Sequence, residues 1–221
     1  MSELDFSEVL DGATKKQFAA IFSKFDKNGS GDIDQKELEQ ALRACDYVFS
    51  KENVSTILKI VDQNHNGAVD FNEFIMLMGY LYIMDQAFND IDKNADGHID
   101  RKELGEALRA VGYNFSEGQL KVLYKMADSD NSGKIELSEF HSLSLFLRFC
   151  RVIFLTADKD HSGGLDPQEF VPLLKALNIP TRKDIVDSLF KTIDVDKSGS
   201  LEFEEIVNLV FVLLFQNRNK T

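Results

Sequence analysis

The sequence predicts an all-α protein built from three similar pairs of helix–loop–helix units. A twelve-residue segment with Asp at place 1, Gly at place 6 and Glu at place 12 occurs six times, with starts separated by 36, 30, 36, 30 and 36 residues. The stretches between the segments carry apolar residues at helical spacing, as in Phe18, Ile21, Phe22 and Phe25. The repeating unit is therefore a pair of 66 residues that occurs three times.

The spacing of the segments assigns the helices in order. The segments are Asp26–Glu37, Asp62–Glu73, Asp92–Glu103, Asp128–Glu139, Asp158–Glu169 and Asp194–Glu205, hereafter loops 1 to 6. Within a pair, 24 residues separate the loops, enough for two helices and a turn. Between pairs only 18 residues remain, Phe74–Ile91 and Phe140–Ala157, and each stretch predicts one continuous helix of about 27 Å shared by two pairs. The predicted domains are residues 1–82, 83–148 and 149–221.

Turn and cap residues follow the same period. Residues that tolerate a left-handed backbone separate the two helices within each pair: Asp46, Gly112 and Asn178. The predicted N-caps of the next helices are Ser50, Ser116 and Thr181, and Ser116 with Gln119 forms a capping-box pattern. The side chains at place 8 are all apolar, which predicts a short two-stranded ribbon between paired loops: Ile33, Val69, Ile99, Ile135, Leu165 and Leu201.

Composition narrows the class of protein. The chain has 221 residues, 43% of them hydrophobic, with 18 Phe and a net charge of −12. This apolar content argues against disorder, and 13 Gly, 3 Pro and 2 Cys argue against collagenous and disulfide-framework classes. The acidic excess argues against nucleic acid, or an anionic membrane, as the resting partner.

Two helical stretches are apolar nearly all round. Arg148 and Arg151 interrupt Phe140–Ala157, and carboxylate-rich loops close both of its ends, so we interpret it as a core helix rather than a membrane span. The last stretch, Ile206–Phe215, fits either the core of the third pair or a docking surface.

Each loop supplies oxygen ligands at alternating places, which is the donor set that a hard cation of flexible coordination number prefers. Places 1, 3, 5 and 12 offer side-chain oxygens, and place 7 offers its backbone carbonyl. Glu at place 12 gives bidentate ligation and favours Ca²⁺ over Mg²⁺, and Gly at place 6 supplies the sharp turn. The predicted metal ligands are Asp26, Asn28, Ser30, Asp32 and Glu37; Asp62, Asn64, Asn66, Ala68 and Glu73; Asp92, Asn94, Asp96, His98 and Glu103; Asp128, Asp130, Ser132, Lys134 and Glu139; Asp158, Asp160, Ser162, Gly164 and Glu169; and Asp194, Asp196, Ser198, Ser200 and Glu205.

The acid at place 9 often acts through a water molecule. Counting places 1, 3, 5, 9 and 12, loops 1 and 2 carry three carboxylates each and the other loops carry four each. We therefore expect loops 1 and 2 to bind more weakly.

These residues resemble the EF-hand superfamily over nearly the whole chain. The alternating spacing, the runs Asp70-Phe-Asn-Glu-Phe74 and Ala87-Phe-Asn-Asp-Ile-Asp92, and Glu103-Leu-x-x-Ala-Leu-x-x-x-Gly-Tyr113 are similar to the penta-EF-hand group, which includes sorcin, grancalcin and the calpain small subunit. The resemblance implies Ca²⁺ as the cofactor, with up to six ions. The Gly/Pro-rich N-terminal arm and the Trp of that group are absent here. The count of six hands also resembles calbindin, calretinin and secretagogin, whose spacing fits less well.

The penta-EF-hand proteins dimerise through an unpaired fifth hand. Here a sixth hand follows the fifth at the spacing found within a pair. We therefore expect the fifth and sixth hands to pair internally and the protein to be a monomer.

Two functions fit the sequence. The first is a Ca²⁺-responsive sensor or adaptor that exposes apolar surface to a protein or membrane partner, since Met76, Met78 and Met84 cluster in the first shared helix. The alternative is a calcium buffer or storage protein with little conformational response.

An enzyme is not expected, because no Cys-His, Ser-His or phosphate-cradling pattern occurs. The four histidines are expected to be solvated residues in or beside loops: His65, His98, His141 and His161.

The expected setting is cytoplasmic. No leader pattern opens the sequence, and Cys45 and Cys150 are expected to be reduced thiols. Six Ca²⁺ would offset the charge of −12, so we expect peripheral membrane or vesicle association in the calcium-loaded state.

Overall fold

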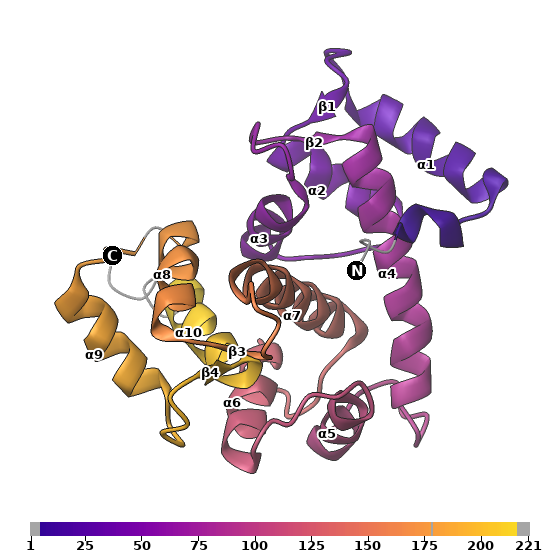
Figure 1. Ribbon diagram of the computed structural model, residues 1–221. Coiled ribbons are helices and arrows are strands. Elements are labelled where there is room, and N and C mark those ends of the chain that lie inside the picture. Colours follow the sequence, from indigo (N-terminus) through magenta and orange to yellow (C-terminus); the bar gives the residue numbers. More distant parts are fainter. Residues whose placement is uncertain (1–4, 178, 216–221) are drawn as a thin grey trace. The chain divides into compact units, whose positions relative to one another are not determined.

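The computed structural model describes residues 5–177 and 179–215, and over these residues its regular secondary structure consists mainly of helices (Figure 1). A 3₁₀ turn, η1 (Phe6–Val9), precedes the first α-helix. The α-helices are α1 (Gly12–Phe25), α2 (Gln35–Ala44), α3 (Lys51–Val61), α4 (Phe71–Ile91), α5 (Arg101–Ala110), α6 (Glu117–Ala127), α7 (Leu137–Ala157), α8 (Pro167–Ala176), α9 (Lys183–Ile193) and α10 (Phe203–Phe215). The all-α prediction is confirmed, and so are the two shared helices, which are α4 and α7 with 21 residues each.

Paired loops are joined by short antiparallel ribbons, as the apolar residues at place 8 predict. Strand β1 (Asp32–Ile33) pairs with β2 (Val69–Asp70), and β3 (Gly164–Leu165) pairs with β4 (Leu201–Glu202). Between loops 3 and 4 the ribbon is reduced to one bridge, in which Ile99 and Ile135 exchange N–H···O bonds of 2.9 and 3.0 Å. All six side chains at place 8 are fully buried. The loops therefore pair in sequence order, and the fifth hand pairs with the sixth inside one chain.

The predicted caps and turns hold with one exception. Asp46 and Gly112 adopt φ values of 66° and 91°, while Asn178 lies outside the described residues. Ser50 accepts the N–H of Asn53 at 3.1 Å, and Ser116 and Gln119 bond to each other's backbone N–H groups.

The exception is Thr181, which is not the N-cap of α9. That cap is Arg182, which makes no side-chain cap bond. The period of 66 residues explains the error, because it places the equivalent of Ser50 and Ser116 at residue 182.

Backbone contacts divide the chain into two compact units, which are described separately. The first unit contains residues up to Leu104 together with Ala127–Leu145. The second contains Gly105–Met126 and the residues from Phe146 onward. Loops 3 and 4 thus belong to the unit that holds the first pair, and the boundaries fall inside α5, at the last residue of α6 and inside α7. The division into three pair domains remains a prediction.

Each unit has its own apolar core. In the first, Phe74 and Met78 on α4 are fully buried, and Phe22 on α1 lies against Phe74 with ring centroids 5.6 Å apart. The turn η1 packs on α4 beside Gly79, where the Phe6 backbone occupies the space that a side chain would need (Figure 1). In the second unit, the buried ring of Phe170 on α8 contacts Phe190 on α9 at 5.8 Å.

One described helix, α7, is long and apolar enough to cross a membrane by length and composition. However, 56% of its apolar window is buried inside the protein, and Phe140, Cys150 and Phe154 on it are buried. Such burial is expected of a core helix and supports that interpretation.

Candidate metal centres

The backbone of every loop turns through the left-handed region at two places. Gly at place 6 has φ between 80° and 88° in all six loops. Place 4 also has positive φ in every loop, which the sequence reasoning missed. The residues at place 4 are Gly29, His65, Ala95, Asn131, His161 and Lys197. Gly29, His65, Asn131 and His161 are residue types enriched in this conformation, whereas Ala95 and Lys197 are not.

Hydrogen bonds within each loop hold the oxygens of places 1 and 3 in position. The Asp at place 1 accepts the N–H of the Gly at place 6, at 2.8–3.2 Å in the six loops. The side chain at place 3 accepts the N–H of place 5, at 2.9–3.0 Å. The first two predicted ligands of each loop are therefore fixed by the loop's own backbone.

Places 5 and 7 also lie close together. In loops 1, 4, 5 and 6 the Ser hydroxyl at place 5 donates to the carbonyl oxygen of place 7, at 2.8–3.0 Å. In loops 2 and 3 the N–H of place 7 donates to the Asn66 or Asp96 side chain, at 2.9 and 3.0 Å. In loops 1, 4, 5 and 6 the two predicted ligand oxygens of places 5 and 7 therefore lie within hydrogen-bond distance of each other.

The Glu at place 12 links the two ends of its loop. In all six loops its Oε2 accepts the N–H of place 9, at 2.9–3.2 Å. In loops 2 to 6 its Oε1 also accepts the N–H of place 2, at 2.7–3.1 Å. In loop 1 the N–H at place 2, from Lys27, bonds instead to Phe25 O at 2.9 Å.

In loops 1, 2 and 5 the Asp at place 9 is the N-cap of the helix that follows. Asp34, Asp70 and Asp166 are the N-caps of α2, α4 and α8, and each forms a capping box with the Glu three residues later. The same Glu is thus a predicted metal ligand and the third residue of the following helix.

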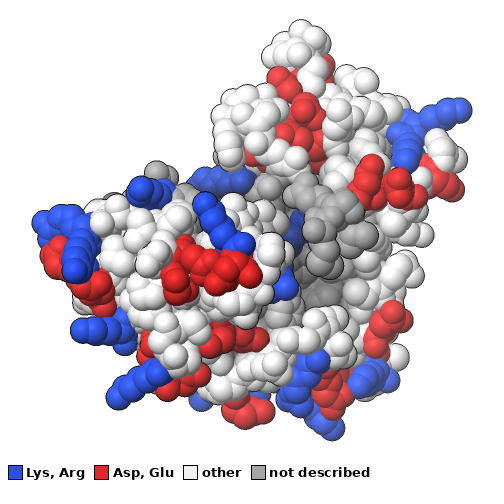
Figure 2. Space-filling view, in the orientation of Figure 1, with Lys and Arg blue, Asp and Glu red and all other residues white. Residues whose placement is uncertain are grey.

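Carboxylates converge most closely in the last three loops. In loops 4, 5 and 6 one oxygen from each of places 1, 3 and 12 lies within 4.8 Å of the other two: Asp128, Asp130 and Glu139; Asp158, Asp160 and Glu169; Asp194, Asp196 and Glu205. Loops 1 to 3 have an Asn amide at place 3. An oxygen-only set that includes three carboxylates fits Ca²⁺. Figure 2 shows further acidic side chains over the ribbon region of loops 1 and 2.

Local contacts change the pKa values of several carboxyl groups in the loops. Bonds from Ser132, chiefly its backbone N–H, lower the pKa of Asp130, and bonds from Ser162, chiefly its hydroxyl, lower the pKa of Asp160. Burial raises the pKa of Glu205 to about 7, and neighbouring Glu202 contributes to the rise. A cation held in loop 6 would offset the cost of burying the Glu205 charge.

One histidine contradicts the expected solvated setting. His141 lies on α7 with only 3% of its side chain exposed, and its Nε2 is 2.8 Å from Asp85 Oδ1. The sequence shows only that His141 lies close to loop 4, and it does not show that Asp85, on another helix, lies beside it in the fold.

An ion pair joins loops 3 and 4. The Lys134 ammonium, at place 7 of loop 4, lies 2.8 Å from Asp96 Oδ2, at place 5 of loop 3, and it lowers the pKa of Asp96. Lys134 is therefore paired with Asp96, which is a predicted metal ligand of the neighbouring loop. We therefore expect this ammonium to compete with a metal ion for Asp96 and to weaken metal binding by loop 3.

Replacing Lys134 with Met should raise the calcium affinity of loop 3 by a factor between about 1.5 and 5, because exposed ion pairs are worth only about 0.2–1 kcal/mol. Site-resolved titration by the amide signal of Gly97 measures the effect. Lys121→Met, which removes the same charge from an exposed position on α6, is the control. Equal gains in both variants would show a general charge effect and contradict the competition.

Comparison with known proteins agrees with this geometry. A family model described as an EF-hand domain pair matches residues 15–79, 83–145 and 148–211. The calcium-binding protein CML19 of Arabidopsis thaliana is 29% identical over 138 residues, which cover 59% of this chain and 83% of that protein. The putative calmodulin-like protein 6 of Oryza sativa subsp. japonica is 33% identical over 133 residues, which cover 56% and 78%.

A solved structure is similar as well. The homolog of programmed cell death 6 protein from Leishmania major Friedlin superposes with a TM-score of 0.53 at 28% identity, covering 72% of this chain and 95% of that one. This match supports the resemblance to the penta-EF-hand group. The family model and these relatives indicate calcium binding and indicate no catalytic family.

Proposed function

The chain belongs to the EF-hand superfamily and binds calcium, and from this premise we propose that it is a Ca²⁺-responsive sensor or adaptor. On binding calcium it exposes apolar surface to a protein or membrane partner. The calmodulin-like relatives support a regulatory role.

The observation that carries the proposal is the double role of the Glu at place 12. In loop 2, Glu73 Oε1 accepts the Gln63 N–H at 2.9 Å, and Oε2 accepts the Asp70 N–H at 3.0 Å. Glu73 is also the third residue of α4. When its two oxygens turn to a metal ion, the first turn of α4 has to follow, so occupancy of the loop is transmitted to a helix.

The surface that such a motion would uncover is the core of the pair. Met78 on α4 is fully buried, and Met76 and Met84 on the same helix are partly buried. Met side chains adapt to irregular partners, so this face of α4 suits a target surface after the hands open. The last helix, α10, is a second source of apolar surface, with Val212 43% exposed.

We assign up to six Ca²⁺ to the chain, one to each loop, held by the ligands predicted from the sequence. The convergence of three carboxylates in each of loops 4 to 6 supports stronger binding there than in loops 1 and 2. Filling of loops 1 and 2 before the others in a site-resolved titration would contradict this order.

The internal pairing of the fifth and sixth hands supports a monomer. We propose a cytoplasmic setting with calcium-dependent attachment to membranes or vesicles, because six Ca²⁺ offset the net charge of −12. Equal sedimentation with anionic liposomes in calcium and in chelator would argue against the attachment.

The decisive experiment for the sensor role is dye binding. An apolar dye such as anilinonaphthalene sulfonate should gain fluorescence when Ca²⁺ is added to chelator-treated protein, and Mg²⁺ at the same concentration should give little gain. A variant with Gln in place of all six Glu at place 12 is the control for dye response without binding. Calcium binding by calorimetry without any gain in dye fluorescence would assign the chain to the buffer class instead.

A further inference from the structure

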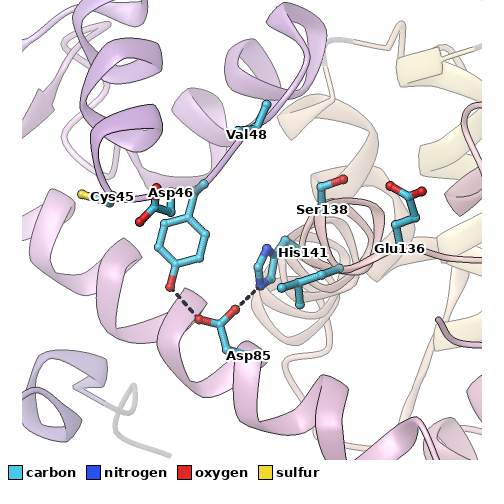
Figure 3. Close-up of a pocket in the computed structure, with 9 residues that line it drawn as sticks. Cys45, Asp46, Val48, Asp85, Glu136, Ser138 and His141 are labelled. Carbon is cyan, nitrogen blue, oxygen red and sulfur yellow. Dashed lines mark hydrogen bonds and ion pairs between the residues drawn. The ribbon is translucent and has the colours of Figure 1, made fainter. Parts of the chain in front are cut away.

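A cavity of about 390 Å³ in the first unit lies where three segments meet (Figure 3). These segments are the linker between α2 and α3, the middle of α4, and the start of α7. On one side of it the Tyr47 hydroxyl donates a hydrogen bond of 2.8 Å to Asp85 Oδ2. The His141 ring, through Nε2, donates to Asp85 Oδ1 at the same distance. The Asp85 carboxylate on α4 thus joins the linker to α7.

Aromatic contacts reinforce this junction. The ring of His141 lies 5.3 Å from that of Tyr47 in an edge-on arrangement and 6.1 Å from that of Phe49. A second polar contact lies beside them, where Asn53 Nδ2 donates to Ser142 Oγ at 2.9 Å. Burial and the bond to Asp85 raise the pKa of Tyr47, so its hydroxyl remains a donor. The first turns of α7 are therefore anchored to the first pair at several points.

The aromatic part of this junction has a counterpart 66 residues later, in the second unit, but its polar part does not, because Arg151 and Val207 stand at the places of Asp85 and His141. Tyr113 and Phe115 are the counterparts of Tyr47 and Phe49, and both contact Phe203 at the start of α10, with centroids 4.8 and 6.5 Å away. The Asn114 N–H donates to Glu204 at 2.6 Å. Arg151, the counterpart of Asp85, lies over the Phe203 ring at 5.6 Å.

In both units, then, the linker between the two helices of a pair carries aromatic rings that pack against the first residues of a later helix. That helix is α7, which follows loop 4, or α10, which follows loop 6. The aromatic contact of the linker is thus common to both units, whereas the hydrogen bonds of Asp85 belong to the first unit. Each of these two helices carries the place 12 Glu of the loop before it, which is Glu139 on α7 and Glu205 on α10.

We propose that Asp85 is a positioning residue for the fourth calcium site. It fixes His141, which follows Glu139 by two residues, and so sets the rotation of the first turn of α7. Glu139 Oε1 accepts the Ser129 N–H at 2.7 Å from the other end of the loop, so a small rotation of α7 moves this ligand relative to Asp128 and Asp130. The same contacts couple the fourth site to the linker of the first pair. The inference rests on the proposed calcium binding by loop 4.

The expected loss of affinity can be judged from other metal sites. There, removing a group that orients a metal ligand lowers the metal affinity about 10- to 100-fold. Because Asp85 acts through the backbone of a helical turn, we expect the lower end. Asp85→Ala should lower the calcium affinity of loop 4 about tenfold and leave loops 1 and 2 within about twofold. Coupling between two positions is reciprocal, so filling of loop 4 should also change the environment of the Tyr47 ring.

The test is a calcium titration of the full chain followed by NMR, with the amide of Gly133 reporting on loop 4 and that of Gly67 on loop 2. Three variants are compared with the unaltered chain: Asp85→Ala, Asp85→Asn and Tyr47→Phe. The Asn side chain keeps an acceptor for the Tyr47 hydroxyl and should restore part of the lost affinity. Tyr47→Phe removes one hydroxyl from an intact core and should give a smaller loss in the same direction. Gln86→Ala, at an exposed position of the same helix, is the control.

Selective weakening at Gly133, with partial recovery in Asp85→Asn, supports the proposal. An unchanged Gly133 titration in both Asp85→Ala and Tyr47→Phe overturns it, as does an equal loss at Gly133 and Gly67, which would mean general damage to the fold. If Gly133 in the unaltered chain does not respond to calcium, the proposed function fails at loop 4, and the inference fails with it. A normal response there with no effect of Asp85 overturns the inference alone.

Discussion

Glu73→Gln is expected to lower the calcium affinity of loop 2 by about 100-fold or more. Altering a group that only orients a metal ligand costs about 10- to 100-fold, and Glu73 is itself a predicted bidentate ligand. The amide also disturbs the loop before any metal arrives. One of its two ends would be an NH₂ group facing an N–H donor, either that of Gln63 or that of Asp70, where a carboxylate oxygen now accepts.

The effect should extend to the partner loop. Ile33 and Val69 pair in the ribbon between loops 1 and 2, and both side chains are fully buried, so loop 2 cannot lose its metal-bound shape without affecting loop 1. Calorimetry should therefore show one site lost and a second site weakened. Glu117→Gln, an exposed glutamate at the start of α6, is the control and should bind as the unaltered chain does. An undiminished stoichiometry in Glu73→Gln would contradict the assignment of this ligand.

The features that could be predicted from the sequence are those set by contacts within a loop or between adjacent loops. Gly67 turns loop 2 because place 6 needs a positive φ, and Val69 pairs with Ile33 because an apolar residue at place 8 recurs in every loop. The two shared helices could be predicted from the length of the segments between pairs, since 18 residues leave no room for two helices and a turn.

The features that were missed depend on residues far apart in the chain or on a conformation that the residue type hides. Ala95 and Lys197 adopt positive φ at place 4 although neither is a typical residue for it. Asp85 and His141 are 56 positions apart, and Asp96 and Lys134 are 38 apart. No periodic pattern brings such pairs together. The sequence repeat explains why each hand has its shape, but the contacts that join one pair to the next come from residues that differ between repeats, such as Asp85 and Arg151.

A chain shortened after Pro180 is expected to dimerise or aggregate. The deletion removes α9, β4 and α10, and with them buried side chains such as Phe190, Leu201 and Val210. Burial of each such side chain contributes about 2 kcal/mol, so the loss approaches the whole stability of a typical domain. In the shortened chain, strand β3 has lost its partner. Leu165 and Phe170, which are fully buried in the full chain, then become exposed to solvent. An unpaired strand edge beside an apolar face is a template for association with a second copy.

Size-exclusion chromatography with light scattering measures the outcome, and a point variant in the full chain separates loss of pairing from loss of length. Leu201→Asp places a charge in the ribbon where β4 meets β3, and it should cause the same association as the truncation. Val195→Asp introduces the same charge in the same loop at a side chain that is 77% exposed, and it should leave the protein monomeric. A shortened chain that stays monomeric and well folded would refute the proposal that internal pairing of the fifth and sixth hands keeps the protein monomeric.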